Sequence, residues 1–488
     1  MQYEYDAVVV GAGPNGLCSA ITLAQAGYSV LVVEAQATVG GGLHSAELIR
    51  PGVLHDVCSA VHPLGVLSPY MRTLPLQEHG LSWVHPPASA AHPLDDGRAL
   101  LLSRSLDATA AQLGRDERAY RRLFAPFLRE PELLLADLLG PMALPRHPLL
   151  FMRFGLRALW SARALTRGLF RQPEARALFA GCAAHAILPL DKLFTAAVGL
   201  LFALTGHVTD WPVARGGSAA IARALASYLH SLGGEIRTGV RVRALTELPK
   251  ARVYLFDLAP RQVVQIAGEQ LPARYRARLL RYNYGPAVFK LDYVLDGPIP
   301  WRDPACLQAS TVHVGGTFEE IAQSERDAWQ GKHSGAPFVM VCQQSQFDDS
   351  RAPPGLHTGY AYCHVPHGSD VDMTGPIERQ IERFAPGFAA RVLARRPMFP
   401  ADIERANEAC VGGVIAGGAS DITQLFTRPV TRLDPYSTPN PGLFLCGAAT
   451  PPGGGVHGMC GYHAAQSALR RLRGVSSTRV TSATRLTP

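Results

Sequence analysis

The stretch Ala7-Val8-Val9-Val10-Gly11-Ala12-Gly13-Pro14-Asn15-Gly16 decides the fold of this chain. Four small or β-branched residues, typical of a buried strand, lead into glycines spaced G-x-G-x-x-G, and residues 17–26 have helical composition. Gly11 permits the tight turn, Gly13 lets backbone approach a pyrophosphate, and Gly16 lets the helix pack closely on the strand. The helix N-terminus, at Pro14 and Asn15, favours negative charge. The stretch therefore predicts the phosphate-binding turn of a dinucleotide-binding α/β domain.

A carboxylate follows at a spacing that suits a ribose contact. A second run of buried-strand composition, Tyr28 to Val33, ends at Glu34 and Ala35, close to the spacing of about 20 residues at which an acid binds ribose hydroxyls. A glycine turn alone occurs in many α/β proteins, but this order of strand, turn, helix and acid favours dinucleotide binding. The order does not distinguish NAD from FAD, since both cofactors carry an ADP moiety.

Glycine-rich backbone recurs in two other parts of the chain. Gly40-Gly41-Gly42 comes shortly after the acid, and the absence of side chains there lets backbone lie against a cofactor. Near the C-terminus, the apolar strand 442–446 enters a glycine loop at 447–458, which leads into a helix. In the middle of the chain, an amphipathic helix at 219–232 precedes the run 233–242. Both glycine-rich parts and this middle region are therefore candidates for one cofactor site.

Together these stretches resemble the phytoene dehydrogenase-related family of FAD-dependent oxidoreductases, within the amine oxidase and carotenoid desaturase superfamily. The resemblance implies that the glycine pair and the C-terminal loop face FAD, and that backbone near Val242 reads the adenine. Those families usually carry arginines around the glycine pair, where this chain has Leu43-His44, and many have Asp in place of Ala448. Such side-chain contacts are therefore not carried over. The predicted cofactor-binding residues are Gly11, Gly13, Pro14, Asn15, Gly16, Glu34, Ala35, Gly41, Gly42, Val242, Gly447, Ala448, Gly455 and Val456.

The predicted fold is α/β, with a Rossmann-type FAD-binding domain assembled from discontinuous segments and a mixed α+β substrate domain. We expect the FAD-binding domain to comprise residues 1–75, 209–262 and 431–473. The substrate domain would comprise residues 76–208, predicted to be largely helical, and residues 263–430. Residues 474–488 lack apolar periodicity, which predicts a disordered tail.

The resemblance also implies a reaction, in which an apolar, isoprenoid or carotenoid-like substrate gives up a hydride to flavin N5. Desaturation or alcohol oxidation would result, with oxygen or a quinone as the electron acceptor. Two alternatives stay open: a redox-neutral isomerase that needs reduced FAD, and a flavin-stabilised binding protein without turnover. No sequence motif for a metal site, a hydrolase nucleophile or a P-loop suggests competing chemistry.

His457 is the candidate catalytic residue, because the resemblance places its glycine-rich loop beside the flavin ring. An imidazole there would orient the substrate or move a proton. The alternative is that the ring of His457 only hydrogen-bonds the backbone of its own loop. His313 and His364 lie in strand-like sequence of the substrate segments, and we interpret both as structural.

Composition and charge limit the binding partners and the cellular compartment that we expect for this protein. Lys plus Arg exceed Asp plus Glu by 47 − 39 = 8, an excess too modest to predict nucleic-acid binding. Nine scattered cysteines and no signal-peptide pattern at the N-terminus predict a cytoplasmic protein with free thiols, and no membrane-spanning helix is expected. Five arginines between Leu149 and Arg171 fall within an arc of about 120° if the stretch is helical. Such a helix either lies on an anionic membrane as a peripheral contact or is an ordinary surface helix. The oligomeric state is not predicted.

Overall fold

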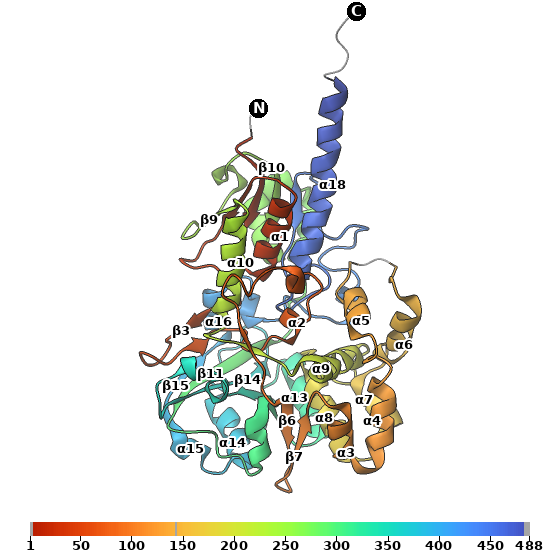
Figure 1. Ribbon diagram of the computed structural model, residues 1–488, viewed down its shortest axis with the longest axis vertical. Coiled ribbons are helices and arrows are strands. Elements are labelled where there is room, and N and C mark those ends of the chain that lie inside the picture. Colours follow the sequence, from red (N-terminus) through yellow and green to blue (C-terminus); the bar gives the residue numbers. More distant parts are fainter. Residues whose placement is uncertain (1–2, 142–143, 483–488) are drawn as a thin grey trace, which may run out of the picture.

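Two lobes, each built around one β-sheet, make up the structure (Figure 1). The computed structural model describes residues 3–141 and 144–482. Both lobes take segments from separate parts of the sequence, as the mixed colours of each lobe in Figure 1 show. The chain therefore crosses between the lobes several times.

The first sheet has five parallel strands in the order β16-β10-β1-β2-β9. Its central strands are largely buried on both faces, which explains their nearly continuous apolar sequence. The prediction of an α/β fold with a discontinuous Rossmann-type domain is confirmed, because this sheet unites strands from the beginning, middle and end of the chain. The strands are β1 (Tyr5–Val10), β2 (Val30–Val33), β9 (Glu235–Arg237), β10 (Ala251–Phe256) and β16 (Leu443–Leu445).

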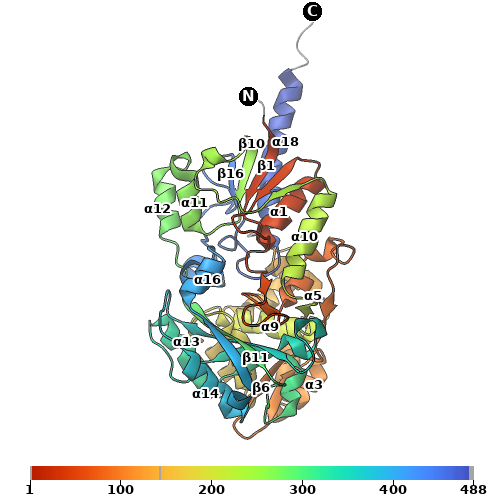
Figure 2. The ribbon, with the colours of Figure 1, turned by 90° about the vertical axis from the view of Figure 1, so that its left-hand side faces the viewer.

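Helices cover both faces of this sheet (Figure 2). On one face α1, α10 and α18 pack together around the buried side chains of β1 and β2, and α11 and α12 cover the opposite face. The bounds are α1 (Pro14–Gln25), α10 (Ala219–Ser231), α11 (Pro260–Ala267), α12 (Ala273–Leu280) and α18 (Met459–Ser482).

The second sheet has seven strands in the order β15-β11-β14-β13-β12-β6-β7, and all neighbours are antiparallel except β12 and β6. One face packs on α14 and forms an apolar core of its own. The strands are β6 (Ala88–Pro93), β7 (Ala99–Leu102), β11 (Ala287–Leu295), β12 (Ala309–Val314), β13 (Val339–Cys342), β14 (His357–Val365) and β15 (Val392–Met398). Two short pairs join β3 (Ser45–Ala46) to β4 (His55–Asp56), and β5 (Trp83–Val84) to β8 (Val213–Ala214).

The other face of the second sheet is covered in part by α8, α9 and α13. Helices between residues 76 and 208 agree with the predicted composition, but the same segment also supplies β6 and β7. The small residues of β6, Ala-Ser-Ala-Ala, show no apolar and polar alternation, so its sequence does not mark it as a strand. The remaining helices are α2 (Pro63–Val66), α3 (Leu106–Ala111), α4 (Glu117–Phe124), α5 (Pro131–Leu138), α6 (Pro148–Ala158), α7 (Ala162–Leu169), α8 (Pro173–Ala184), α9 (Thr195–Thr209), α13 (Phe318–Trp329), α14 (Thr374–Phe384), α15 (Phe388–Arg391), α16 (Pro400–Ala406) and α17 (Ile422–Leu425).

Two expectations about helices differ from the structure. The basic stretch 149–171 is not one helix, because α6 ends at Ala158 and α7 begins anew with Ser161 as its N-cap, whose hydroxyl accepts a hydrogen bond from the N–H of Ala164. The arginines of the stretch therefore do not share one helical face. At the C-terminus, the backbone of α18 continues to Ser482, where a disordered tail was expected from residue 474. Residues 483–488 of that tail lie outside the described residues.

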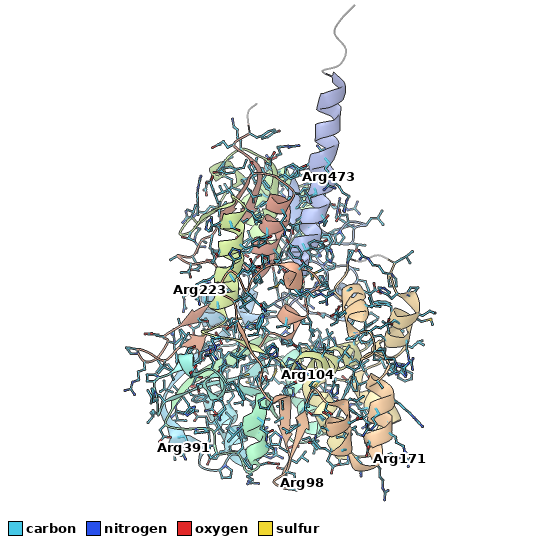
Figure 3. The ribbon with its side chains drawn as sticks, in the orientation of Figure 1. Arg98, Arg104, Arg171, Arg223, Arg391 and Arg473 are labelled. Carbon is cyan, nitrogen blue, oxygen red and sulfur yellow. The ribbon has the colours of Figure 1, made fainter. Side chains whose placement is uncertain are left out.

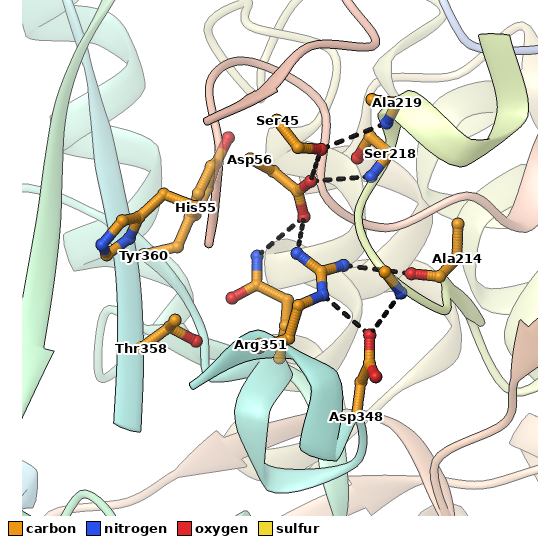
Figure 4. Close-up of polar contacts among 12 residues, drawn as sticks. Ser45, His55, Asp56, Ala214, Ser218, Ala219, Asp348, Arg351, Thr358 and Tyr360 are labelled. Carbon is orange, nitrogen blue, oxygen red and sulfur yellow. Dashed lines mark hydrogen bonds and ion pairs between the residues drawn. The ribbon is translucent and has the colours of Figure 1, made fainter. Parts of the chain in front are cut away.

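A buried ion network joins the two lobes (Figure 4). Arg351, in a turn after β13, donates through Nη1 to Asp56 Oδ2 at 2.9 Å and through Nε to Asp348 Oδ2 at 2.8 Å. The other oxygen of Asp56 accepts from the hydroxyl of Ser45 at 2.7 Å and the N–H of Ser218 at 2.8 Å. The Arg351 guanidinium lowers the pKa of Asp56 against the effect of burial, so both groups are charged. The network therefore fixes the loop around β4 against the substrate lobe.

Candidate functional site

A cavity of about 830 Å³ lies between the lobes and takes its walls from both. One wall is backbone from the glycine stretches of the first lobe, and the opposite wall is a face of the seven-stranded sheet together with helix α9. The carboxyl ends of β1, β2, β10 and β16 all reach this cavity. It therefore lies where ligands bind in open α/β sheets.

The glycine turn between β1 and α1 forms one end of the wall. Gly11 has φ +100°, and a Cβ there would lie 2.7 Å from the carbonyl oxygen of Asp257. A Cβ on Gly13 would lie 2.6 Å from Asp257 Oδ2, and one on Gly16 would collide with the carbonyl of Gly11. Backbone atoms therefore exclude a side chain at Gly11 and Gly16, and a side chain at Gly13 would displace the Asp257 carboxylate. Gly11 and Gly13 line the cavity, whereas Gly16 lies behind the turn.

Two polar side chains of the predicted set border this turn. Glu34, at the end of β2, lines the cavity and accepts hydrogen bonds from the N–H groups of Ala12 at 2.7 Å and Gln36 at 2.8 Å. Asn15, in the first turn of α1, also lines the cavity, and its buried Oδ1 has no hydrogen-bond partner among the described residues. A buried polar atom without a partner is unfavourable unless a ligand or water binds it. The turn therefore has unused hydrogen-bonding capacity directed at a ligand.

Backbone from the other two stretches continues the same wall. Gly41, with φ +57°, packs on the first turn so closely that a Cβ would lie 3.0 Å from Gly13 Cα. The other residues predicted to contact the cofactor also face the cavity, and only Gly16 does not. They are Pro14, Ala35, Gly42, Val242, Gly447, Ala448, Gly455 and Val456. The structure therefore brings together segments that are more than 400 residues apart in sequence.

The ring of His457 is not among the described groups that line the cavity. It is buried behind Gly455, whose added Cβ would lie 3.1 Å from His457 Cδ2, and its Nδ1 accepts a hydrogen bond from the N–H of Met459 at 3.0 Å. Burial lowers the pKa of His457 to about 4, so the ring is neutral at physiological pH. The geometry supports the alternative in which His457 holds the glycine loop and the start of α18, and it does not support a catalytic role.

Asp257 is a site residue that sequence reasoning missed. Its carboxylate accepts a hydrogen bond from the N–H of Gly16 at 2.8 Å, and it lines the cavity at the start of α1. Burial raises the pKa of Asp257 to about 7, which allows it to hold a proton beside a second negative charge. An acid directly after β10 was a usable signal, because β10 neighbours β1 and parallel strands end at the same edge of the sheet.

The substrate-lobe wall is aromatic and mostly apolar. Alternate residues of β14, namely Tyr360, Tyr362 and His364, share the sheet face that lines the cavity. Other side chains of this wall come from β12, β13, α9 and the loops around them, namely Thr311, Met340, Cys342, His185, Ile187, Val198, Leu201, Phe202 and Trp211. The cavity therefore combines a glycine-lined backbone wall with an aromatic wall suited to an apolar molecule.

Comparisons with known proteins agree with this architecture. Residues 9–74 match the family model described as an NAD(P)-binding Rossmann-like domain. The chain is 28% identical to a mouse (Mus musculus) protein named pyridine nucleotide-disulfide oxidoreductase domain-containing protein 2, over 96% of this chain and 94% of that one. It is 25% identical to a lycopene-forming phytoene desaturase of Pseudescherichia vulneris, over 95% and 98% of the two chains. A solved structure of putrescine oxidase superimposes with a TM-score of 0.60 at 17% identity, over 97% and 99% of the two chains, which shows a shared fold.

Proposed function

We propose that this chain, a flavin-dependent oxidoreductase of the amine oxidase and carotenoid desaturase superfamily, removes a hydride from an apolar substrate held between its two lobes. One observation carries the proposal. A single cavity joins glycine backbone from three distant stretches to the aromatic face of the second sheet. A flavin on the first wall would therefore meet a substrate on the second.

The residues present fit an extended FAD. The glycine turn leaves room only for backbone, and Glu34 lies where an acid binds ribose. Asn15 offers a buried oxygen that has no hydrogen-bond partner within the described part of the chain. Gly447, Ala448 and Gly455 supply further backbone along the same wall. When bound, FAD supplies the electron-accepting N5 that hydride transfer requires. Oxygen or a quinone remains our proposal for the final electron acceptor.

The protein would position the substrate for this chemistry and exclude water from it. Tyr360, Tyr362 and Trp211 line the cavity, and the neighbouring α9 adds aliphatic side chains. Burial of an apolar substrate against them releases water and is favourable by about 25 cal/mol per Å² of apolar surface. The same walls would hold the reacting C–H bond in place and exclude bulk water from it.

Anaerobic mixing of the flavin-loaded protein with apolar candidate substrates tests the reaction. We expect the oxidised flavin absorbance near 450 nm to bleach, with a desaturated or carbonyl product formed in equal amount. Product without net bleaching would instead establish the redox-neutral isomerase. Tight binding with neither product nor bleaching would establish the binding protein and contradict the oxidoreductase.

We also propose that α6 carries a membrane contact. Its exposed side includes Leu149, Met152 and Leu156, of which Leu149 is 77% and Leu156 61% exposed, and Leu159 and Trp160 continue this apolar surface beyond the helix. These five residues are the α6 stripe. An ordinary surface helix turns such residues inward, so the stripe favours a lipid contact. Figure 1 shows α6 at the outer edge of its lobe.

Charge and position agree with an anionic lipid surface. Arg153 is exposed on α6 itself, and Arg167 is exposed on α7, where its guanidinium is 3.8 Å from Glu319. The arginines labelled in Figure 3 are spread over both lobes, so the apolar stripe rather than the net charge distinguishes this place. Helix α6 also packs on α9, and Val198, Leu201 and Phe202 of α9 line the cavity. No helix within residues 3–141 and 144–482 is both long and apolar enough to cross a bilayer.

Flotation with vesicles that contain an anionic phospholipid tests the α6 stripe. We expect the wild-type protein to float with the vesicles and Met152→Glu/Leu156→Glu to remain in the dense fraction, because charged side chains on the stripe oppose insertion. Leu393→Glu is the matched control, since Leu393 is a similarly exposed leucine on β15. Equal flotation of all three proteins would contradict the proposal.

A further inference from the structure

We propose that the substrate-lobe end of the cavity binds a neutral oxygen function, a hydroxyl or carbonyl group, at the end of an otherwise apolar substrate, through the pair Glu325 and His364. This inference rests on the proposed function, because it names the class of substrate that the same cavity takes. It favours alcohol oxidation over desaturation of a pure hydrocarbon.

Glu325 and His364 form a buried, hydrogen-bonded pair in the substrate-lobe wall. His364 lies on β14 and Glu325 on α13, and His364 Nδ1 is 2.8 Å from both carboxylate oxygens. Both side chains are almost completely buried, with exposed fractions of 0% and 1%. A carboxylate in such a place orients the imidazole, because Nδ1 must carry the proton that it donates. His364 is therefore held in one tautomer when neutral.

The second nitrogen of His364, Nε2, is buried and has no hydrogen-bond partner among the described residues. His364 is a cavity-lining residue, but its side chain is 0% exposed, so a ligand oxygen reaches Nε2 only when a neighbouring side chain moves aside. Neighbouring polar groups on this wall are paired, since the Tyr362 hydroxyl donates to Met340 Sδ at 3.0 Å, and His185 Nε2 is 3.1 Å from His313 Nε2. An unpaired buried nitrogen is unfavourable, and a ligand oxygen bonded to it would remove that cost.

His313 does not offer the same opportunity, although its Nδ1 is also unpaired. That nitrogen faces the backbone of α8, because a Cβ on Gly181 would lie 2.5 Å from it, and His313 is not among the cavity-lining residues. Burial and the nearby His364 lower the pKa of His185 to about 3, so His185 stays neutral. Among the described histidines of this wall, His364 is therefore the one with both an acidic side chain as its partner and an unpaired nitrogen.

The hydrogen-bonding capacity of His364 Nε2 determines which oxygen group of a substrate it can bind. A neutral His364 accepts a hydrogen bond from a hydroxyl at Nε2, and a protonated His364 donates one to a carbonyl oxygen. The pair therefore suits both an alcohol and its oxidised product. A substrate carboxylate accepts hydrogen bonds only, so it would oppose the acceptor Nε2 of a neutral His364 and bring a second carboxyl group into the same buried site. Hydroxyl and carbonyl groups are favoured over carboxylates for this reason.

Calorimetric titration of the flavin-loaded protein with matched ligands tests the inference. The probes are geraniol, geranic acid and 2,6-dimethylocta-2,6-diene, the hydrocarbon of the same skeleton. We expect geraniol to bind at least tenfold more tightly than either other probe. Equal affinities, tighter binding of the acid, or no binding of geraniol would overturn the inference. This series uses only the wild-type protein, so it does not depend on whether a variant folds.

Variants of Glu325 and His364 test whether this pair causes the preference for geraniol. In Glu325→Gln/His364→Phe, which removes both members of the pair, we expect the preference for geraniol over the hydrocarbon to disappear. His357→Phe is the control, since His357 begins the same strand and is not among the cavity-lining residues. A folded, yellow double variant that kept the tenfold preference would overturn the role of the pair. Preferred binding without any flavin bleaching would uphold the pair and contradict the oxidoreductase.

Discussion

Gly13→Val is expected to give a folded protein without flavin. Even a Cβ at this position would lie 2.6 Å from Asp257 Oδ2, and the two further methyl groups of valine would occupy the space in which a phosphate approaches the start of α1. Displacement of Asp257 would also break its hydrogen bond to the N–H of Gly16. The ratio of absorbance at 450 nm to that at 280 nm after purification measures retention, and we expect it to fall to the baseline.

Gly335→Val is the matched control for this change. Gly335 lies in an exposed loop of the substrate lobe, and a Cβ there would meet no atom within 4 Å. We expect this control to be as yellow as the wild type. A Gly13→Val protein that carried a full complement of flavin would show that the pyrophosphate does not lie at this turn.

Arg351→Met is expected to lower the free energy of unfolding by about 3–5 kcal/mol, the usual cost of removing one partner from a buried ion pair. The methionine would leave Asp56 and Asp348 buried without their shared cation, and the carbonyl of Ala214 would lose a donor at 3.1 Å. Denaturant unfolding followed by circular dichroism measures the change. Because Figure 4 shows the network between segments of both lobes, we also expect flavin retention to weaken.

A surface pair provides the comparison for Arg351. Arg405 is 74% exposed and pairs with Asp402 one helical turn away. Pairs of this kind contribute about 0–1 kcal/mol, so Arg405→Met should leave the unfolding curve nearly unchanged. Equal and small effects of the two substitutions would mean that the buried network does not hold the lobes together.

Local patterns predicted the nucleotide-binding half of the molecule well. The turn from Gly11 to Gly16 and the acid Glu34 lie within one strand-helix-strand unit, so their spacing alone determines their geometry. The C-terminal loop and Val242 were found by resemblance to a family, and the structure places both on the same cavity wall. For His457 the sequence left a catalytic and a structural role open, and its buried ring, which is not among the described cavity-lining groups and accepts from the N–H of Met459, favours the structural role.

Long-range contacts explain what the sequence did not reveal. Asp257 meets Gly16 across 241 residues, and Glu325 meets His364 between a helix and a strand. No local periodicity encodes such contacts, because they depend on how the elements pack. The helix break near Trp160 was likewise missed, since Ser161 resembles any polar surface residue until its hydroxyl caps α7.

The order of strands in the first sheet determines when that sheet can be completed during synthesis on the ribosome. Strand β16 and helix α18 complete the nucleotide lobe, and both come late in the order of elements along the chain. All seven strands of the other lobe, which lie between residues 88 and 398, emerge before them. A nascent chain therefore carries an unfinished nucleotide lobe until β16 and α18 have been made, so cofactor loading follows synthesis of the whole second sheet.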